Sequence, residues 1–146
     1  MSRITARLQI ALEIARKTAL LATCPRKSVG CVLLDDTYSI FSPGFNGASR
    51  RLKHCSEVGC LLVDVGGRMS CQRAVHAEAN AIYAAARAGR SVRGSIAVTT
   101  VRPCEKCAIA MYQAGVVACG YDELYEGPEG IVDELRQAGW SCAKLP

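Results

Sequence analysis

The second half of the chain alternates between strand-like and helix-like segments, and this alternation limits the fold more than any other feature. Apolar runs at 95–100, 116–120 and 140–144 predict strands. The amphipathic segments 103–114 and 129–138 lie between them and predict helices. Strand, helix and strand in that order form a βαβ unit, whose strands are parallel and whose crossover is right-handed. We therefore expect a sheet with helices packed against it.

The first half supplies the remaining elements of the expected fold. Residues 4–19 predict an amphipathic helix, and 29–34 with 38–42 predict a hairpin of two strands. A further helix is predicted over 77–88. The segment 43–73 is rich in Gly, Ser and Arg and has little periodicity, so we expect a long functional loop or one held by something other than packing. Together these elements predict an α/β fold, a three-layer α/β/α sandwich about a mixed five-stranded sheet.

Composition narrows the class of protein. The 146 residues suffice for one domain with its own core, and no linker divides residues 1–146. Charges interrupt the first 22 residues, which predicts an amphipathic helix rather than a secretory leader, and no apolar run has the length that a bilayer needs. The nine cysteines are therefore expected to bind metal or to take part in catalysis rather than to form disulfides.

The net charge of +5 suits a small phosphorylated substrate, although such a surplus is also typical of a solvated face. The sequence has no basic strip lined with aromatic residues, the feature that would indicate binding of single-stranded nucleic acid. We therefore expect a small-molecule substrate, with no nucleic acid and no membrane as partner.

Two short motifs each open a predicted helix. The first, "HAE", contains His76 and Glu78, and the second, "PCEKC", contains Cys104 and Cys107. Because both helices are expected to begin at one edge of the sheet, the imidazole and the two thiolates can converge as ligands of one Zn²⁺. The fourth position would hold a water whose pKa falls to about 7. We expect Glu78 to move a proton from this water to the substrate and its leaving amine.

Less specific interpretations of the same residues remain open. The C-x-x-C pair alone could be a redox dithiol or half of a structural zinc knuckle, and Glu78 could be an ordinary carboxylate at a helix start. The joint occurrence of H-A-E, a strand and P-C-x-x-C about 28 residues later is far more specific than either half. The combination matches the signature of zinc nucleobase deaminases, in which hydroxide attacks C4 of a cytosine and ammonia leaves.

Beyond these motifs, the chain resembles the deoxycytidylate (dCMP) deaminases, including bacterial late-competence and phage members, over nearly its full length. The matching stretches are "TCPRKSVG" (23–30), "GFNG" (44–47), "HCSEVGCLLVD" (54–64), "CQRAVHAEANAI" (71–82) and "VTTVRPCEKCA" (98–108). The resemblance implies a cytidine-deaminase-like topology and hydrolytic deamination of dCMP to dUMP, a precursor for thymidylate. Activity on dCTP or on 5-substituted dCMP remains open.

The resemblance also implies roles for residues around the substrate. Asn46 would hydrogen-bond the sugar or position the base, although Asn-Gly is equally a turn former. Arg26, with Ser28 close by, would bind the 5′-phosphate, because Arg grips phosphate bidentately. Tyr125 would lie at the phosphate end of the pocket, and Ala77 would contact the substrate.

One departure from the family pattern concerns regulation. Phe45 stands where the family usually has tyrosine, in a loop that also serves activation by dCTP and inhibition by dTTP. We expect the replacement of tyrosine by Phe45 to affect allosteric control, through Phe45 and Asn46, more than it affects catalysis. The family is typically hexameric, so we expect a homo-oligomer, with the edge around Arg87, Arg90 and Arg93 at a subunit interface. The expected location is cytoplasmic, in the host cytoplasm if the chain is phage-encoded.

Four cysteines in or beside the long loop form a second group: Cys24, Cys55, Cys60 and Cys71. Relatives carry a second, structural zinc in this region, and the resemblance is firmest for Cys24 and Cys55. Cys60 and Cys71 would complete a closed site, with His54 as substitute ligand. Metal–ligand bonds would then replace the missing core of the loop. Buried, reduced thiols are the alternative. The three remaining cysteines lie in predicted strands, where we expect only core packing.

Two other functions remain open. A deaminase of a free nucleoside, or of a base in nucleic acid, would be almost insensitive to Arg26→Ala. A catalytically silent zinc module that serves assembly or DNA uptake would keep its function after Glu78→Ala, while changes of the metal ligands would unfold it.

Overall fold

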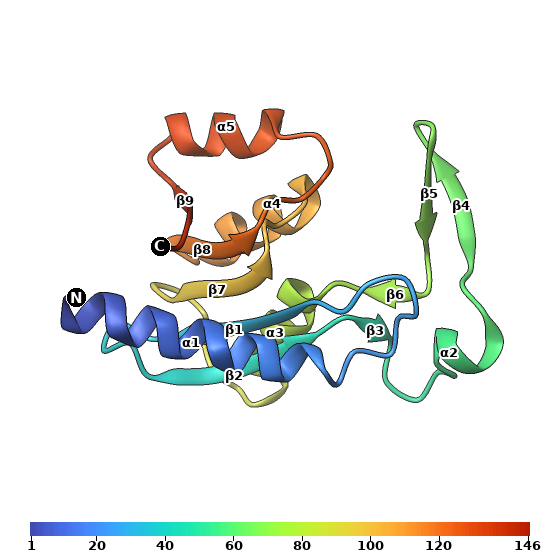
Figure 1. Ribbon diagram of the computed structural model, residues 1–146, viewed down its shortest axis with the longest axis horizontal. Coiled ribbons are helices and arrows are strands. Elements are labelled where there is room, and N and C mark those ends of the chain that lie inside the picture. The colour runs from blue at the N-terminus through green and yellow to red at the C-terminus, as the bar shows by residue number, and fades with distance from the viewer.

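The structure, a computed structural model, describes residues 1–146 and is built around one mixed sheet (Figure 1). Its five strands run in the order β2-β1-β7-β8-β9. Their bounds are Gly30–Leu34 (β1), Ile40–Phe45 (β2), Ile96–Val101 (β7), Ala118–Glu123 (β8) and Ser141–Lys144 (β9). Strand β1 is antiparallel to β2 and β7, whereas β7, β8 and β9 are parallel. The mixed five-stranded sheet is confirmed.

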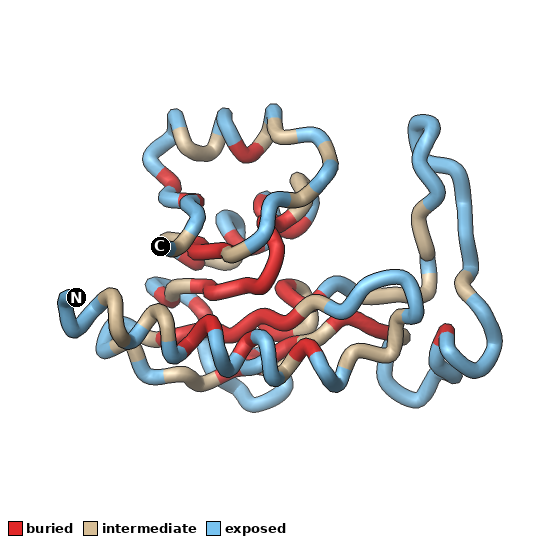
Figure 2. Tube along the Cα trace, in the orientation of Figure 1, coloured by how far each residue is buried: buried red, intermediate tan, exposed pale blue.

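Helices cover both faces of this sheet. The helices that do so are α1 (Arg3–Ala19), α3 (Ala77–Arg87), α4 (Glu105–Ala114) and α5 (Gly130–Gln137). Val32 and Leu34 of β1 pack with α1 on one face, while Cys31 and Leu33 pack with α3 and α4 on the other. A strand that is buried on both faces needs such a continuous apolar run, and Figure 2 shows the inner strands in the colour of buried residues. The three-layer α/β/α architecture is confirmed.

The segment 43–73 is not the irregular loop that its composition predicts. It contains β3 (Gly47–Ala48), α2 (Cys55–Val58), β4 (Leu62–Val65) and β5 (Arg68–Cys71), and β6 (Ala74–Val75) follows. Strands β4 and β5 pair as an antiparallel hairpin that turns at Gly66 and Gly67, both at positive φ. All residues of β4 are exposed, and the hairpin stands away from the sheet (Figures 1 and 2). Because neither face of β4 is buried, the hairpin has no alternation of apolar residues.

Several predicted boundaries are also wrong in detail. Strand β2 covers Ile40–Phe45 rather than 38–42, and Tyr38 lies before it at positive φ. Helix α4 begins at Glu105 rather than at Pro103, because Cys104 has an extended backbone and serves as the N-cap. Strand β8 begins at Ala118 rather than at Val116, since the N–H of Val116 is bonded to Met111 as part of the turn that ends α4. The correction to α4 matters for function, because it puts Cys104 at the very start of a helix.

A close contact between β2 and α3 fixes the start of α3. A Cβ atom on Gly44 would lie 2.2 Å from the carbonyl oxygen of Ala77, so only glycine lets the helix approach the strand this closely. One turn later, Asn80 Nδ2 donates a hydrogen bond of 2.7 Å to the carbonyl of Phe45. The first turn of α3, which carries the HAE motif, is therefore held against the sheet from both ends. None of the helices combines the length and the apolar composition needed to cross a membrane.

Candidate metal centre and active site

Three side chains from two helix starts converge at one end of the sheet. His76 is the N-cap of α3, Cys104 is the N-cap of α4, and Cys107 lies in the first turn of α4. His76 Nδ1 is 3.5 Å from Cys104 Sγ and 3.4 Å from Cys107 Sγ, and the three ligand atoms all lie within 4.8 Å of one another. The convergence expected from the motif spacing is therefore present in the structure.

The donor set and its dimensions fit a tetrahedral zinc ion. Zn–S bonds of about 2.3 Å and Zn–N bonds of about 2.0 Å at a tetrahedral angle separate sulfur from nitrogen by about 3.5 Å. The two observed separations between His76 Nδ1 and the cysteine sulfurs are 3.4 and 3.5 Å. One imidazole and two thiolates leave a fourth position for a small ligand, which is typical of catalytic rather than structural zinc sites.

The thiols of Cys104 and Cys107 shift each other's pKa in opposite directions. The hydrogen bond from Cys107, together with the one from His76, lowers the pKa of Cys104 to about 4. The hydrogen bond to Cys104 and burial raise the pKa of Cys107 above its usual range. The pair thus holds one negative charge before any cation binds, and a bound metal would displace the second proton.

Glu78 is a buried carboxyl beside the three candidate ligands. It lies in the first turn of α3 and is only 4% exposed. Burial raises its pKa, opposed by its own backbone N–H and by the charge of His76. A buried carboxyl with a raised pKa, next to a candidate metal site, has the properties of a group that both accepts and returns a proton. An ordinary carboxylate at a helix start would be solvated, and Glu78 is not.

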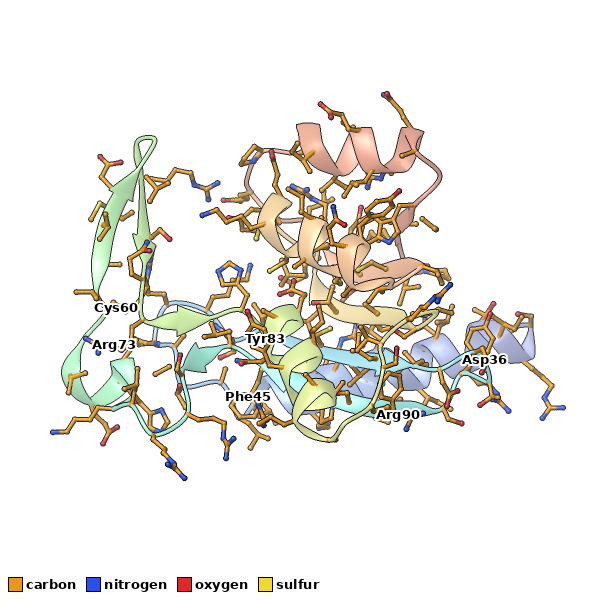
Figure 3. The ribbon with its side chains drawn as sticks, turned by 180° about the vertical axis from the view of Figure 1, so that it is seen from behind. Asp36, Phe45, Cys60, Arg73, Tyr83 and Arg90 are labelled. Carbon is orange, nitrogen blue, oxygen red and sulfur yellow. The ribbon has the colours of Figure 1, made fainter.

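A second group of thiols lies at the base of the β4–β5 hairpin. The sulfurs of Cys55, Cys60 and Cys71 lie within 4.8 Å of one another, and the sulfurs of Cys55 and Cys71 are 3.7 Å apart. Two thiolates on one tetrahedral zinc would be separated by about 3.8 Å. The three residues belong to the start of α2, the segment before β4 and the end of β5, and Figure 3 labels Cys60 at the foot of the hairpin. The group therefore joins the ends of the segment that lacks a core of its own.

The electrostatics at the hairpin base also favour a cation. Although burial opposes ionisation, hydrogen bonds from the backbone N–H groups of Ala74, Arg73 and Leu61 lower the pKa of Cys71 to about 7. Burial, followed by the hydrogen bond with Cys71, raises the pKa of Cys55 to about 11. The cluster thus has one thiol that ionises readily and a neighbour that would release its proton when a metal binds.

The structure does not bring Cys24 and His54 into this group of three. Cys24 lies outside the cluster, although its charge contributes to the raised pKa of Cys60 after burial and the larger effects of Cys71. His54 is the N-cap of α2, and its backbone N–H donates to Glu57 Oε2 at 2.8 Å. Three of the four predicted cysteines, Cys55, Cys60 and Cys71, therefore come together. Neither Cys24 nor His54, the two candidates for a fourth ligand, joins them.

The residues predicted to contact substrate surround the same end of the sheet, but several are engaged with backbone. Asn46 Oδ1 accepts from the N–H of Val29 at 2.8 Å, and its Nδ2 donates to the carbonyl of Lys27 at 2.7 Å. The amide of Asn46 thus braces the backbone on both sides of Ser28. Arg26 is exposed, and its Nη2 donates to the carbonyl of Met69 at 3.2 Å. These contacts favour a turn-stabilising role for Asn46 and leave most N–H donors of Arg26 free.

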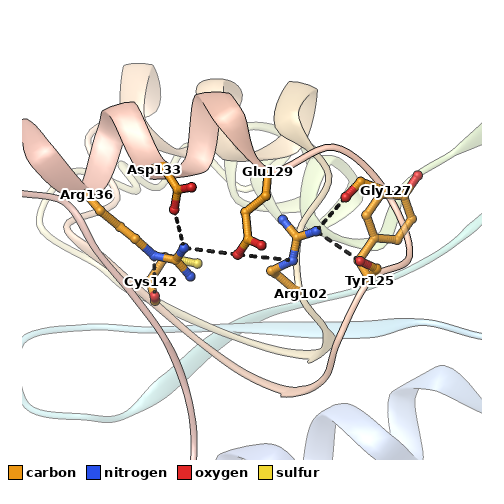
Figure 4. Close-up of polar contacts among 7 residues, drawn as sticks. All are labelled: Arg102, Tyr125, Gly127, Glu129, Asp133, Arg136 and Cys142. Atoms are coloured by element: carbon orange, nitrogen blue, oxygen red, sulfur yellow. Dashed lines mark hydrogen bonds and ion pairs between the residues drawn. The ribbon is translucent and has the colours of Figure 1, made fainter. Parts of the chain in front are cut away.

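A buried arginine next to the PCEKC motif escaped the sequence-based interpretation. Arg102 is 2% exposed, and its Nη2 donates to the carbonyl oxygens of Tyr125 and Gly127 at 2.9 and 3.1 Å (Figure 4). Its Nε lies 3.8 Å from Glu129 Oε1. Arg102, the residue just before the PCEKC motif, therefore ties the loop after β8 to the end of β7. No signal in the sequence distinguishes this arginine from a surface charge, because its burial depends on how two distant loops meet.

Comparisons with known protein families and sequences also indicate a zinc-binding site in this chain. The profile of the cytidine and deoxycytidylate deaminase zinc-binding region matches residues 1–122. ComE operon protein 2 of Bacillus subtilis is 36% identical over 121 residues, which are 83% of this chain and 61% of that protein. The deoxycytidylate deaminase of Enterobacteria phage T4 is 40% identical over 78 residues, 53% of this chain and 40% of that protein. The chain thus spans less than two thirds of the length of these relatives.

A solved structure resembles the chain over its whole length. The dCMP deaminase from the cyanophage S-TIM5, in complex with dCMP and dUMP, superposes with a TM-score of 0.79 at 25% sequence identity. The match covers 99% of this chain and 99% of that one. The core sheet, its helices and the region of the two motifs therefore have a counterpart in a protein of similar size.

Proposed function

The chain belongs to the family of cytidine and deoxycytidylate deaminases, and on that premise we propose that it hydrolyses dCMP to dUMP and ammonia. The observation that carries the proposal is the triangle of His76, Cys104 and Cys107, with sulfur–nitrogen separations of 3.4 and 3.5 Å, beside the buried carboxyl of Glu78. This donor set suits one catalytic Zn²⁺. The cyanophage relative, whose structure contains dCMP and dUMP, supports the choice of substrate.

The roles of the residues follow from their chemistry. His76, Cys104 and Cys107 would hold zinc, which supplies a water of lowered pKa when it is bound. Glu78 accepts a proton from the water that adds to C4 of the cytosine, and it delivers protons to the ring nitrogen and to the leaving amine. Because Glu78 is buried and its pKa is raised, it can hold that proton between the two transfers. Gly44 and Asn80 act indirectly by fixing the first turn of α3.

A second, structural zinc is proposed at the base of the hairpin. Cys55, Cys60 and Cys71 supply three thiolates with a spacing suited to a tetrahedral ion. Cys24 is the fourth ligand in this proposal, since its charge contributes to the raised pKa of Cys60. His54 is the substitute. Such a site would hold α2 and the hairpin together where packing does not.

The nucleotide is proposed to bind with its 5′-phosphate toward Arg26, Ser28 and Tyr125. Arg26 and Ser28 are exposed, and Tyr125 is partly buried in the loop after β8. Ala77, between the two functional residues of the HAE motif, would contact the base. Asn46 would then act mainly through the backbone at residues 27–29, which it braces with both ends of its amide.

We also propose that the protein is a cytoplasmic homo-oligomer, a hexamer by resemblance to its family, with dCTP and dTTP as possible effectors. The outer sides of α3 and α4 support assembly, because several large apolar side chains there are exposed. These side chains are Tyr83, Ile109, Tyr112 and, just beyond α4, Val117. Phe45, whose carbonyl is tied to α3 by Asn80, is the position at which the effector response would differ from the family pattern.

A panel of substrates tests the proposed function. The loss of absorbance on deamination is followed with dCMP, dCTP, CMP, deoxycytidine and 5-methyl-dCMP, each with and without dCTP or dTTP. Fastest turnover of dCMP supports the proposal, whereas equal turnover of deoxycytidine and dCMP favours a nucleoside deaminase. A zinc-loaded protein that turns over none of these compounds favours the silent zinc module.

A further inference from the structure

Near its tip, the exposed hairpin contacts the loop after β8 through the side chain of Arg68. Arg68 begins β5, and its guanidinium carbon lies 5.5 Å from the centre of the Tyr125 ring. Arg102 lies 5.6 Å from the same ring, so Tyr125 has a guanidinium group from each of two distant segments near its ring. A Cβ atom on Gly127 would lie 2.1 Å from the Tyr125 ring and 2.8 Å from Arg68 Nη1, so glycine is needed where these groups pack.

The two cationic groups next to β5 have no acidic partners. The ion pairs of the chain are formed by Arg16, Arg90, Arg102 and Arg136. Arg26 donates only to the carbonyl of Met69, the residue after Arg68 on the same strand. Arg68 on β5, beside the ring of Tyr125, and Arg26, which is bonded to the next position of that strand, therefore carry two uncompensated positive charges. Most of their N–H donors are free to bind an anion.

We propose that Arg68 is a specificity-determining residue that binds the 5′-phosphate of the substrate, with the Tyr125 ring as the platform that holds its guanidinium in place. This inference rests on the proposed function and deepens it. A guanidinium that stacks on an aromatic ring keeps its edge N–H groups for a bidentate contact with phosphate oxygens. Within segment 43–73, Arg68 of the hairpin lies against the loop after β8.

The proposal gives the cysteine cluster a place in substrate recognition. A two-stranded hairpin that packs on nothing is marginally stable in water. Cys55, Cys60 and Cys71 lie together at its base. Near its tip, Arg68 contacts the ring of Tyr125, and Arg102 donates a hydrogen bond to the backbone carbonyl of Tyr125. The hairpin thus contacts the rest of the protein at its base, at Met69 through Arg26 and near its tip through Arg68, and a phosphate bound between Arg68 and Arg26 would add a further contact. An exposed cation–π contact alone contributes little to stability, so a purely structural role for Arg68 predicts almost no effect of its removal.

The test compares two variants with the same change of charge. Arg68→Gln is compared with Arg50→Gln, a control at an exposed arginine that has no assigned role. Both zinc-loaded full-length proteins are assayed with dCMP and with deoxycytidine, which lacks the phosphate. Arg68→Gln is expected to raise KM for dCMP about 10- to 100-fold, the range of a charge-assisted hydrogen bond, with kcat changed less than about twofold. Deoxycytidine turnover and both activities of Arg50→Gln stay at the wild-type level.

Further variants separate charge from geometry. Arg68→Lys keeps the charge but not the planar fork, so its KM for dCMP should fall between those of wild type and Arg68→Gln. Tyr125→Ala removes the platform, and Arg68→Gln should then have a smaller effect than in the wild-type background. An unchanged KM for dCMP in Arg68→Gln overturns the proposal, as does an equal loss with dCMP and deoxycytidine, which would indicate a structural role.

Calorimetric binding of dCMP and deoxycytidine separates this proposal from the proposed function, because binding needs no turnover. If wild type binds dCMP more tightly than deoxycytidine without deaminating it, and Arg68→Gln removes the difference, the proposed function fails while the role of Arg68 stands. If wild type deaminates dCMP and Arg68→Gln binds it equally well, the role of Arg68 fails while the function stands. Equal binding of dCMP and deoxycytidine by the wild type overturns the role of Arg68.

Discussion

His76 Nδ1 and Cys107 Sγ lie 3.4 Å apart, although 31 positions of the sequence separate the two residues. A distance so close to that between two ligands of one tetrahedral zinc predicts the effect of removing either ligand. Cys107→Ser should lower the zinc content by about one ion per chain and abolish deamination. Cys31→Ala, a change at a buried cysteine outside both clusters, should leave the zinc content unchanged. Metal analysis of the dialysed proteins measures both, and an unchanged zinc content in Cys107→Ser would contradict the site.

Glu78→Gln separates proton transfer from metal binding. The amide has the shape of the carboxyl but cannot carry the proton, so kcat should fall about 10²- to 10⁴-fold while zinc stays bound. Because burial raises the pKa of Glu78, the neutral amide removes a buried charge, and the thermal midpoint should stay the same or rise. Steady-state kinetics with metal analysis and thermal unfolding check the three expectations. Loss of zinc together with activity would instead make Glu78 a support of the ligands.

The hairpin base is tested by counting zinc. With two sites loaded, the wild type should contain about two zinc ions per chain, and Cys60→Ser about one. The hairpin should become sensitive to proteases in Cys60→Ser, because β4 has no buried residue to hold it. Mass spectrometry of the native protein and limited proteolysis give the two readouts. A wild-type content of about one zinc would rule out the second site and leave Cys55, Cys60 and Cys71 as packed thiols.

Gly44→Ala tests the contact that fixes the start of α3. Its Cβ atom would meet the Ala77 carbonyl at 2.2 Å, so strand and helix must separate, at a cost of about 1–3 kcal/mol in the free energy of unfolding. Because Ala77 lies between His76 and Glu78, activity should fall as well. Gly130→Ala is the matched control, since a Cβ atom there meets nothing within 4 Å. Chemical denaturation and activity assays of both variants test this prediction. Equal stability of the two variants would contradict it and show that β2 and α3 can move apart at little cost.

Stability should depend on pH through Asp35. A hydrogen bond from the Thr37 hydroxyl, and then one from the Ser39 N–H, lower the pKa of Asp35 below its usual value. A carboxyl whose pKa is lowered by folding stabilises the fold above its unfolded pKa of about 3.9, and this contribution is lost as the pH falls through the lower folded value. Asp35→Asn should therefore melt earlier than wild type at neutral pH and converge with it in acid. A constant difference in melting temperature from pH 7 to pH 3 would exclude this role.

The sheet and the convergence of the candidate metal ligands could be predicted because both depend on local patterns. Alternating strands and helices after residue 95 impose parallel crossovers. Strands β2 and β7 are both antiparallel to β1, so they end at the same edge of the sheet, where α3 and α4 begin. Once that is known, the spacing within "HAE" and "PCEKC" is enough to place His76 next to Cys104 and Cys107. The N-cap positions of His76 and Cys104 refine this prediction but do not change it.

The β4–β5 hairpin and the role of Arg102 could not be predicted in the same way. The hairpin buries neither face, so it has no alternation of apolar residues, and only the pair Gly66 and Gly67 marked its turn. Arg102 is buried because the loop after β8 folds over it, and this depends on segments about 20 residues away in sequence. Contacts of this kind are tertiary, and no periodicity or motif within one segment encodes them.

The production of dUMP and ammonia from dCMP by the zinc-loaded protein tests the central claim most directly. The two products are quantified over time by chromatography and by an enzymatic ammonia assay, with wild type and Glu78→Gln in parallel. Equal amounts of dUMP and ammonia from wild type, with formation at least about 10²-fold slower from Glu78→Gln, are the predicted result. No dUMP from a wild-type preparation that carries zinc at His76, Cys104 and Cys107, or equal rates for the two proteins, would contradict it.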